Sequence, residues 1–225
     1  PAGAAFAALS DQDDVWLPAK LARATDRLAA LPEDRPALYC GRTVICDEGL
    51  RRLGLSPLFA RPPSFRNALT QSIGGGNTMV LNRPGLALAR AAAAEAGRII
   101  MHDWWLYQLV SGAGGTVLYD PEPQLLYRQH RQNQIGSNSS TAARLRRLGM
   151  VARGVLRDWN ATNIAALRAS AHRLTPENRA LLEAFAAARA APFPRRLGAF
   201  RRLGLYRQTR GGGLSYWCAA AAGLI

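Results

Sequence analysis

Short apolar runs alternate with longer amphipathic segments along the first 140 residues of the chain. The short runs predict strands at residues 6–10, 38–45, 77–81, 116–119 and 124–128. Apolar residues at helical spacing predict helices at residues 18–31, 84–96 and 103–110. Short strands that alternate with helices are typical of layered α/β proteins. We therefore predict an α/β fold with a mixed sheet flanked by helices.

The first predicted helix has a defined start and one apolar face. Pro18 suits the first turn of a helix, because proline loses no hydrogen bond there. Leu21, Ala24 and Leu28 recur at helical spacing, so we expect them to share one face. In the third predicted helix, Gly112 marks the expected C-terminal end.

The positive charge is concentrated after residues 136–141, a Ser- and Asn-rich stretch that is typical of a linker. Residues 1–140 carry 14 Lys and Arg against 12 Asp and Glu, whereas residues 141–225 carry 15 Arg against 3 acids. The net charge of +14 thus divides into +2 and +12. We expect an α/β domain over residues 1–140 and a basic, mostly helical tail over residues 141–225.

The tail places Leu, Val and Tyr between arginines at helical spacing over residues 142–156 and 195–206. Basic amphipathic helices bind anionic membrane surfaces, so we expect the tail to dock the protein on lipid. The alternative is that these helices lie on the core while their arginines face solvent. We do not expect nucleic acid as a partner, because the aromatic residues are not interleaved with the charges as base stacking requires.

Composition restricts the compartment and the class of protein. Hydrophobic residues make up 48% of the chain, enough for a sizeable core. The three cysteines lack CxxC spacing, which indicates a reducing, cytoplasmic setting and argues against a zinc site. The longest apolar run, residues 214–225, has 12 residues and is too short for a transmembrane helix. The basic residues are 28 Arg and the single Lys20, a bias that we attribute to a GC-rich genome.

Acidic side chains follow directly on the first predicted strand. Asp11, Asp13 and Asp14 lie within four residues, and ligands of open α/β sheets bind at strand ends. Neighbouring carboxylates repel one another unless a cation compensates, and Mg²⁺ or Mn²⁺ takes oxygen ligands while bridging phosphates. We therefore expect a metal site here. The alternative is that Asp13 or Asp14 merely caps the helix near Pro18.

A second cluster comprises His102, Asp103, Trp104 and Trp105. A carboxylate beside two large aromatic rings is partly desolvated, which raises its pKa and makes it a better base. Asp103 is therefore a candidate general base. The alternative is an N-terminal helix cap at Asp103, with both tryptophans filling the core.

Two further features are weak when each is taken alone. His130 lies in a polar stretch after a predicted strand, where a structural role is as good an interpretation as metal binding. The glycine run 74–76 allows backbone to approach a ligand closely, or forms a flexible turn.

Four motifs in this order resemble the family 2 glycosyltransferases, and most of all the bacterial rhamnosyltransferase-like branch. They are SDQDDVWLPAKL (10–21), GGGNTMVLNR (74–83), HDWWLY (102–107) and YRQHRQNQIG (127–136). The resemblance covers about residues 4–140. It implies a partial GT-A fold and transfer of a sugar, with inversion, from a dTDP- or UDP-sugar donor. The acceptor would be a glycan or lipid-linked molecule in surface polysaccharide synthesis.

The resemblance also assigns roles to residues. The divalent metal, Mg²⁺ or Mn²⁺, would be held by Asp11, Asp13 and His130. Asp103 would be the catalytic base. The contacts with donor and acceptor would come from Gly75, Gly76, Asn77, Trp104 and Trp105.

One departure from the family pattern leaves two functional hypotheses. Family members begin with a strand, helix and strand unit that binds the nucleotide, and this sequence begins only just before the first acidic motif. The first hypothesis is the acceptor-side part of an active enzyme, peripheral on the cytoplasmic face of the plasma membrane. The alternative is a truncated, inactive remnant that acts as a membrane- or partner-binding module.

Overall fold

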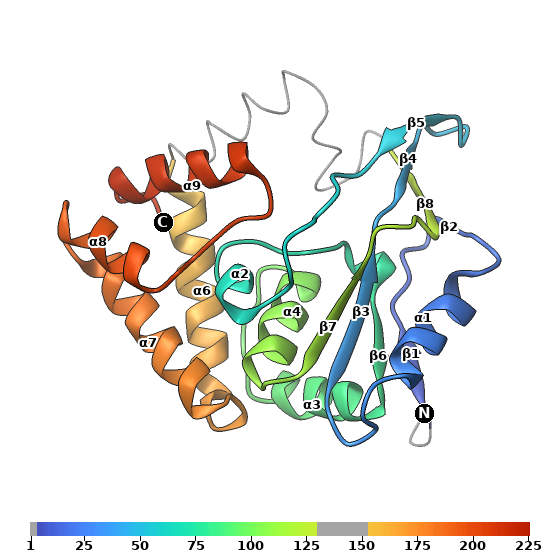
Figure 1. Cartoon of the computed structure of the whole chain (residues 1–225), viewed down its shortest axis with the longest axis horizontal. Coiled ribbons are helices and arrows are strands. Elements are labelled where there is room, and N and C mark those ends of the chain that lie inside the picture. Colours follow the sequence, from blue (N-terminus) through green and yellow to red (C-terminus); the bar gives the residue numbers. More distant parts are fainter. Residues whose placement is uncertain (1–3, 130–152) are drawn as a thin grey trace.

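The protein is described here by a computed structural model that covers residues 4–129 and 153–225. Its main sheet has the strand order β1 (Phe6–Ala8), β6 (Val80–Asn82), β3 (Ala37–Gly41) and β7 (Thr116–Asp120), as Figure 1 shows. β6 runs antiparallel to both β1 and β3, and β7 runs parallel to β3. The sheet is therefore mixed, with β1 and β7 at its edges.

A second, smaller sheet continues from the first. Its order is β2 (Val15–Trp16), β8 (Leu125–Arg128), β4 (Val44–Cys46) and β5 (Arg52–Leu55). The chain passes from β3 into β4 and from β7 into β8. β7 is parallel to β3 in the first sheet, and β8 is parallel to β4 in the second. The segment between β1 and β2 likewise crosses from one sheet to the other, so the acidic residues lie at the junction of the two sheets.

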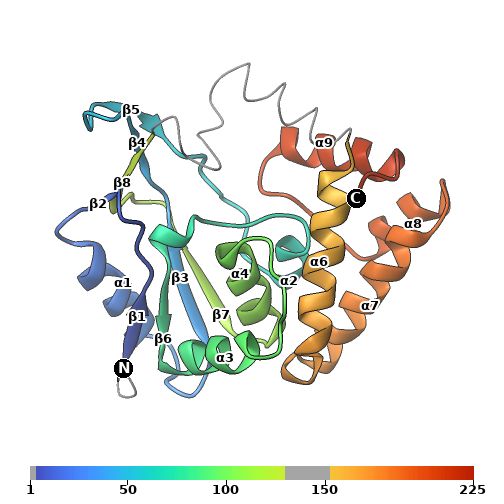
Figure 2. The same ribbon diagram turned by 180° about the vertical axis from the view of Figure 1, so that it is seen from behind.

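Helices cover both faces of the main sheet (Figures 1 and 2). On β3, Ala37 and Tyr39 face α1 (Lys20–Ala29), and Leu38 and Cys40 belong to the core on the other side. Such alternation is the strand period of two. Because both faces are covered, every residue of β3 is buried.

The opposite face is covered by α3 (Arg83–Ala93) and α4 (His102–Gly112), with the short α2 (Phe65–Ala68) beside α4. Asn82 begins α3 as a side-chain cap, because its Oδ1 accepts the amide hydrogen of Gly85 at 2.9 Å. A single turn of 3₁₀ helix, η1 (Gly76–Thr78), precedes β6.

The C-terminal part is helical. It consists of α6 (Val155–Ala169), the 3₁₀ turn η2 (Ala171–Arg173), α7 (Pro176–Ala190), α8 (Arg195–Arg202) and α9 (Arg210–Ala221). These helices lie on the α4 side of the molecule, away from β1 (Figure 1). No helix within residues 4–129 or 153–225 has the length and apolar character needed to cross a membrane.

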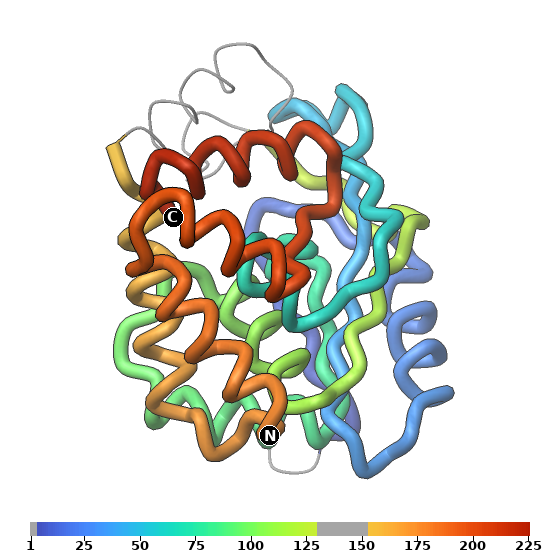
Figure 3. The backbone as a smooth tube through the Cα atoms, turned by 60° about the vertical axis from the view of Figure 1, so that its left-hand side comes forward, coloured from blue at the N-terminus to red at the C-terminus, as the bar shows by residue number. Residues whose placement is uncertain are grey.

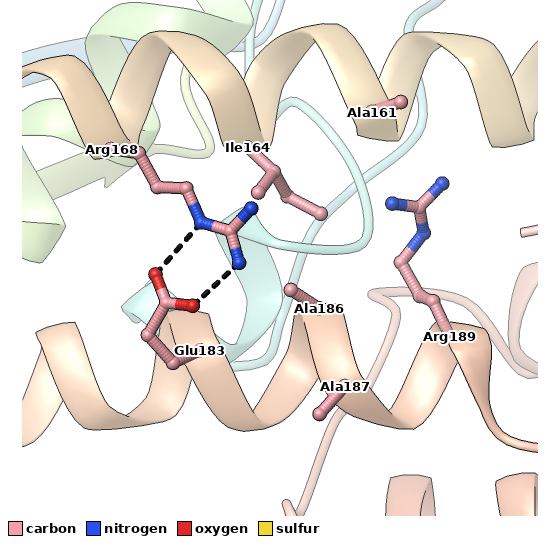
Figure 4. Close-up of a pocket in the computed structure, with 7 residues that line it drawn as sticks. All are labelled: Ala161, Ile164, Arg168, Glu183, Ala186, Ala187 and Arg189. Atoms are coloured by element: carbon pink, nitrogen blue, oxygen red, sulfur yellow. Dashed lines mark hydrogen bonds and ion pairs between the residues drawn. The ribbon is translucent and has the colours of Figure 1, made fainter.

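An ion pair spans a groove between α6 and α7. Arg168 and Glu183 form a bidentate pair at 2.9 and 2.5 Å across it, to one side of Ala186 and Ala187 (Figure 4). None of the predicted site residues lines this groove, which joins two helices of the C-terminal part.

Residues 203–208, which we call the C-terminal latch, fasten these helices to segment 61–71. The carbonyl oxygen of Tyr206 accepts a hydrogen bond from Nδ2 of Asn67 at 2.9 Å. The side-chain amide of Gln208 donates to Oδ1 of Asn67 at 3.1 Å and to the carbonyl of Arg61 at 3.0 Å. Figure 3 shows this part of the tail running beside the segment that precedes α2. The contacts are polar and specific, so the tail has a fixed register on the α/β part.

The structure confirms the predicted α/β class and is consistent with a partial GT-A-like fold. Several local predictions are wrong. Pro18 precedes α1, which begins at Lys20, and the start of the predicted strand 77–81 belongs to η1. The predicted strand 38–45 is split into β3 and β4, because Arg42 and Thr43 carry the chain from one sheet to the other. Leu21 does not share the buried face of α1. It is 44% exposed, and Lys20, Ala24 and Leu28 form that face instead. The predicted division at residue 140 lies outside the described residues and stays a prediction.

Asp120 joins α1 to the end of β7 from a fully buried position. Its carboxylate accepts hydrogen bonds from Arg23 at 2.6 and 3.0 Å and from the Tyr39 hydroxyl at 2.8 Å, and it pairs with Arg27 at 3.0 Å. Burial alone would raise the pKa of Asp120, but these donors and the Glu122 amide outweigh it and lower the pKa to about 2.

We expect Asp120→Asn to destabilise the fold by about 2 kcal/mol, because a buried anion is lost while its donors remain. Glu183→Gln, which breaks an ion pair that is about half exposed, should cost no more than about 0.5 kcal/mol. Urea unfolding at pH 7 measures both. Because folding lowers the pKa of Asp120 from 3.8 to about 2, its contribution is complete above pH 3.8 and is lost as the pH falls toward 2. Equal losses for the two variants would contradict this role.

Candidate functional site

The acidic loop, residues 10–14, crosses between the two sheets after β1. Asp11 is exposed, and Asp13 and Asp14 are partly exposed. Asp14 Oδ2 accepts a hydrogen bond from Nδ2 of Asn77, and its Oδ1 accepts one from the amide of Arg128 at 3.0 Å. Asp14 is therefore the acid that anchors the loop.

Arg128 holds the same loop from the side of β8. Its Nε donates to the backbone carbonyl of Asp13 at 2.9 Å, and a terminal nitrogen donates to the carbonyl of Glu48 at 3.0 Å. The guanidinium therefore ties the acidic loop to the turn between β4 and β5. Sequence reasoning placed Arg128 in a motif but assigned it no role.

The glycine run lies against both candidate clusters. Gly76 lies against the imidazole of His102, which would have to move to make room for a Cβ at this position. At Gly74 a Cβ would lie 3.0 Å from Cβ of Cys40. The next residue along, Asn77, bonds to Asp14. Because glycines have no side chains, the acidic loop and the start of α4 can both lie close to this short segment.

Asp103 lies in the first turn of α4 and is partly exposed. Its Oδ1 accepts the amide hydrogen of Trp104 at 2.7 Å, and Ser72 is also within hydrogen-bonding range. Burial raises the pKa of Asp103 above its usual range, and these hydrogen bonds oppose the shift. The predicted desolvated carboxylate is present, although the helix cap is Met101 and not Asp103.

The two tryptophans are core residues. Trp104 is 3% exposed and donates from Nε1 to the carbonyl of Ala68 at 2.7 Å. Trp105 is 5% exposed and belongs to the main core cluster. This geometry favours the interpretation that both rings fill the core, and their predicted contact with an acceptor stays a prediction.

The residues proposed for the metal are only partly described. His130 lies outside the described residues, and within residues 4–129 and 153–225 no three His, Cys, Asp or Glu side chains are grouped as metal ligands. Asp11 and Asp13 still offer two accessible carboxylates from one loop. Mg²⁺ is commonly held by one or two carboxylates together with substrate phosphates, so this donor set suits a hard divalent cation.

Segment 61–71 joins the C-terminal latch to α4. The amide of Ser64 donates to the hydroxyl oxygen of Tyr107 at 2.9 Å, and that hydroxyl lies 3.0 Å from Oδ1 of Asn67. Gln71, next to Ser72, accepts hydrogen bonds from Gln208 at 2.9 Å and Arg207 at 3.2 Å. The tail therefore contacts a segment that ends next to Ser72, and Ser72 lies near Asp103. No sequence signal predicted this link.

Comparison with known proteins adds one relative. The chain is 29% identical over 156 residues to the dTDP-rhamnosyl transferase RfbG of Shigella flexneri. The match covers 65% of this chain and 50% of that protein, so the chain spans about half the length of this relative. The similarity supports a relationship to glycosyltransferases. No family model matches the chain, and no solved structure matches it. Membership of family 2 and the GT-A fold remain predictions.

Lys20 lies near Asp14 of the acidic loop and was not predicted as a site residue. It is the first residue of α1 and is 2% exposed. Its Nζ lies 3.6 Å from the ring centroid of Trp16. Burial lowers the pKa of Lys20 to about 8, and the nearby Asp14 carboxylate opposes the shift.

We expect Lys20 to titrate near pH 8, whereas lysine in an unfolded chain titrates near 10.5. Lys20 is the only lysine, so lysine-selective ¹³C labelling gives a single Cε signal to follow by NMR. Between pH 8 and 10.5 the unfolded chain binds more protons at Lys20 than the folded chain, so stability should rise with pH in this window. A midpoint above pH 10 would show that the ammonium is solvated.

Proposed function

We propose that this chain is the metal- and acceptor-binding part of an inverting glycosyltransferase that uses a nucleotide-sugar donor. One observation carries the proposal: Asn77, which follows the glycine run, binds the acidic loop, and Gly76 lies against His102 at the start of α4. The loop proposed to hold the metal and the helix that carries the proposed base thus contact one short segment. Sugar transfer from a nucleotide donor needs both.

In this proposal Asp103 is the general base. Its carboxylate takes the proton from an acceptor hydroxyl while that oxygen forms a bond to the anomeric carbon of the donor. The bond between the anomeric carbon and the diphosphate oxygen breaks at the same time, and the nucleoside diphosphate leaves. The raised pKa of Asp103 suits a base that works near neutral pH. Attack from the side opposite the leaving group inverts the anomeric carbon.

The departing diphosphate needs positive charge near it. Asp11 and Asp13 would hold Mg²⁺ or Mn²⁺, with His130 as a further proposed ligand. Such a cation, when bound, neutralises charge on the diphosphate. Asp14 and Arg128 hold the loop in place through Asn77 and through the backbone of Asp13.

The name of the relative suggests the donor. RfbG is a dTDP-rhamnosyl transferase, so we propose a dTDP-sugar, with rhamnose as the first candidate and UDP-sugars as the comparison. The acceptor would be a glycan or lipid-linked intermediate of surface polysaccharide. The net charge of residues 141–225 favours docking on the anionic inner face of the plasma membrane.

A second candidate is a non-catalytic module that binds a membrane or a protein partner. The outer edge of β1, which pairs with no other strand among the described residues, favours it. Unpaired strand edges are sites for pairing with another chain. Nucleotide binding separates this candidate from the enzyme.

We expect calorimetric titration to show that dTDP binds the chain at micromolar concentration in the presence of Mn²⁺ and more weakly without it. Asp13→Ala should weaken the Mn²⁺-dependent binding at least tenfold, because one of two proposed metal carboxylates is lost. Glu33→Ala, which removes an acid from an exposed position after α1, is the control and should bind as the unmodified chain does. Absence of dTDP and UDP binding to folded protein would support the non-catalytic module.

We expect Asp103→Asn to lower turnover by about 10² to 10⁴, because general base catalysis typically contributes that much. Turnover is measured as dTDP released from dTDP-rhamnose in the presence of a lipid-linked glycan acceptor. Binding of dTDP should be unchanged, since Asp103 does not belong to the acidic loop. Asp26→Asn, at an exposed position of α1, is the matched control. Full turnover in Asp103→Asn would remove Asp103 from the mechanism.

A further inference from the structure

The Lys20 ammonium is buried without a hydrogen-bond acceptor among the described residues. The indole Nε1 of Trp16, whose ring lies against that ammonium, also lacks an acceptor there. The side chain of Lys20 follows the buried face of α1 with Ala24 and Leu28. Two neighbouring donors near the acidic loop, the ammonium and the indole N–H, therefore have no hydrogen-bond acceptor among the described residues.

An ammonium in this position lowers the stability of the fold. Desolvating a charge is costly unless hydrogen bonds and an opposite charge compensate it, and the aromatic ring compensates only in part. The chain uses Arg at every one of its other 28 basic positions. Lys20 is the exception, and it is buried next to the candidate site. A compact ammonium fits there, whereas a planar guanidinium would need several acceptors. A bias in genome composition toward arginine does not explain why this one position has lysine.

The negative charge around Lys20 indicates what the ammonium offsets. The Asp14 carboxylate acts on Lys20 electrostatically, and Asp11 and Asp13 lie in the same loop. Three carboxylates and a diphosphate carry more negative charge than one divalent cation neutralises. Arg128 adds a second cation, and it donates hydrogen bonds to the backbone carbonyls of Asp13 and Glu48.

We propose that Lys20 supplies the positive charge that allows the acidic loop to hold a metal-bound diphosphate. The inference rests on the proposed function and adds to it a residue that determines affinity. Lys20 acts through its field, without touching the ligand. A cation at this place has opposite effects on the two partners of the loop. It repels a metal ion that binds alone, and it attracts a diphosphate that binds with the metal.

The test is Lys20→Met in the full chain, which keeps the length of the side chain and removes the charge. Unit charges about 8 Å apart change a binding constant about threefold to thirtyfold for effective dielectric constants of about 80 to 20. We therefore expect Mn²⁺ alone to bind about threefold to thirtyfold more tightly to the variant. Inorganic pyrophosphate in saturating Mn²⁺ should bind more weakly by a similar factor. Calorimetry measures both constants.

A control variant isolates the charge at this position. Arg90→Met removes one positive charge from an exposed position of α3, and neither affinity should change. The midpoint of thermal unfolding should be unchanged or raised in Lys20→Met, because a buried charge is replaced by an apolar side chain.

The outcomes separate this inference from the proposed function. If the unmodified chain binds Mn²⁺ and pyrophosphate but Lys20→Met changes both affinities in the same direction, or neither, the role of Lys20 is wrong and the proposed function stands. If the unmodified chain binds neither ligand, both proposals are overturned. Loss of folding in Lys20→Met would assign the ammonium to the stability of the core and would also overturn the inference.

Discussion

The carboxylate of Asp14 joins three segments that lie far apart in the sequence. One oxygen binds the side chain of Asn77 after the glycine run, and the other binds the amide of Arg128 at the end of β8. Hydrogen bonds to an ionised carboxylate are stronger than those to a neutral one, so this joint favours the charged form of Asp14. Burial opposes that charge, because it raises the pKa of Asp14. The arrangement of the acidic loop, the glycine run and β8 depends on this partly buried carboxylate.

The C-terminal helices extend the same framework on the other side of the main sheet. Tyr206 and Gln208 bind segment 61–71, and Tyr107 links that segment to α4. Asp103 lies in the first turn of the same helix. The helical tail and the helix that carries the proposed base are therefore connected through segment 61–71.

Lys20 and Asp120 show two ways in which this fold handles buried charge. Asp120 is surrounded by arginines and a tyrosine hydroxyl, and its charge stabilises the joint between α1 and β7. Lys20 has no hydrogen-bond acceptor among the described residues, and burial lowers its pKa. Natural proteins give up stability mainly at functional sites. This contrast is the physical reason to assign Asp120 to the fold and Lys20 to the site.

The sequence alone determined the α/β class, most of the helices and strands of the first part, and the segments that carry acidic, glycine-rich and tryptophan-rich chemistry. These features depend on local periodicity and side-chain type, which the sequence states directly. Only the tertiary structure decided that β3 and β4 belong to different sheets and that Lys20, not Leu21, is buried. It also decided that Asp14 is the anchor among the three acids, and that Trp104 and Trp105 fill the core. Each of these depends on a neighbour distant in sequence, such as Asn77, Arg128 or the C-terminal latch, and local pattern carries no information about which distant residue will be adjacent.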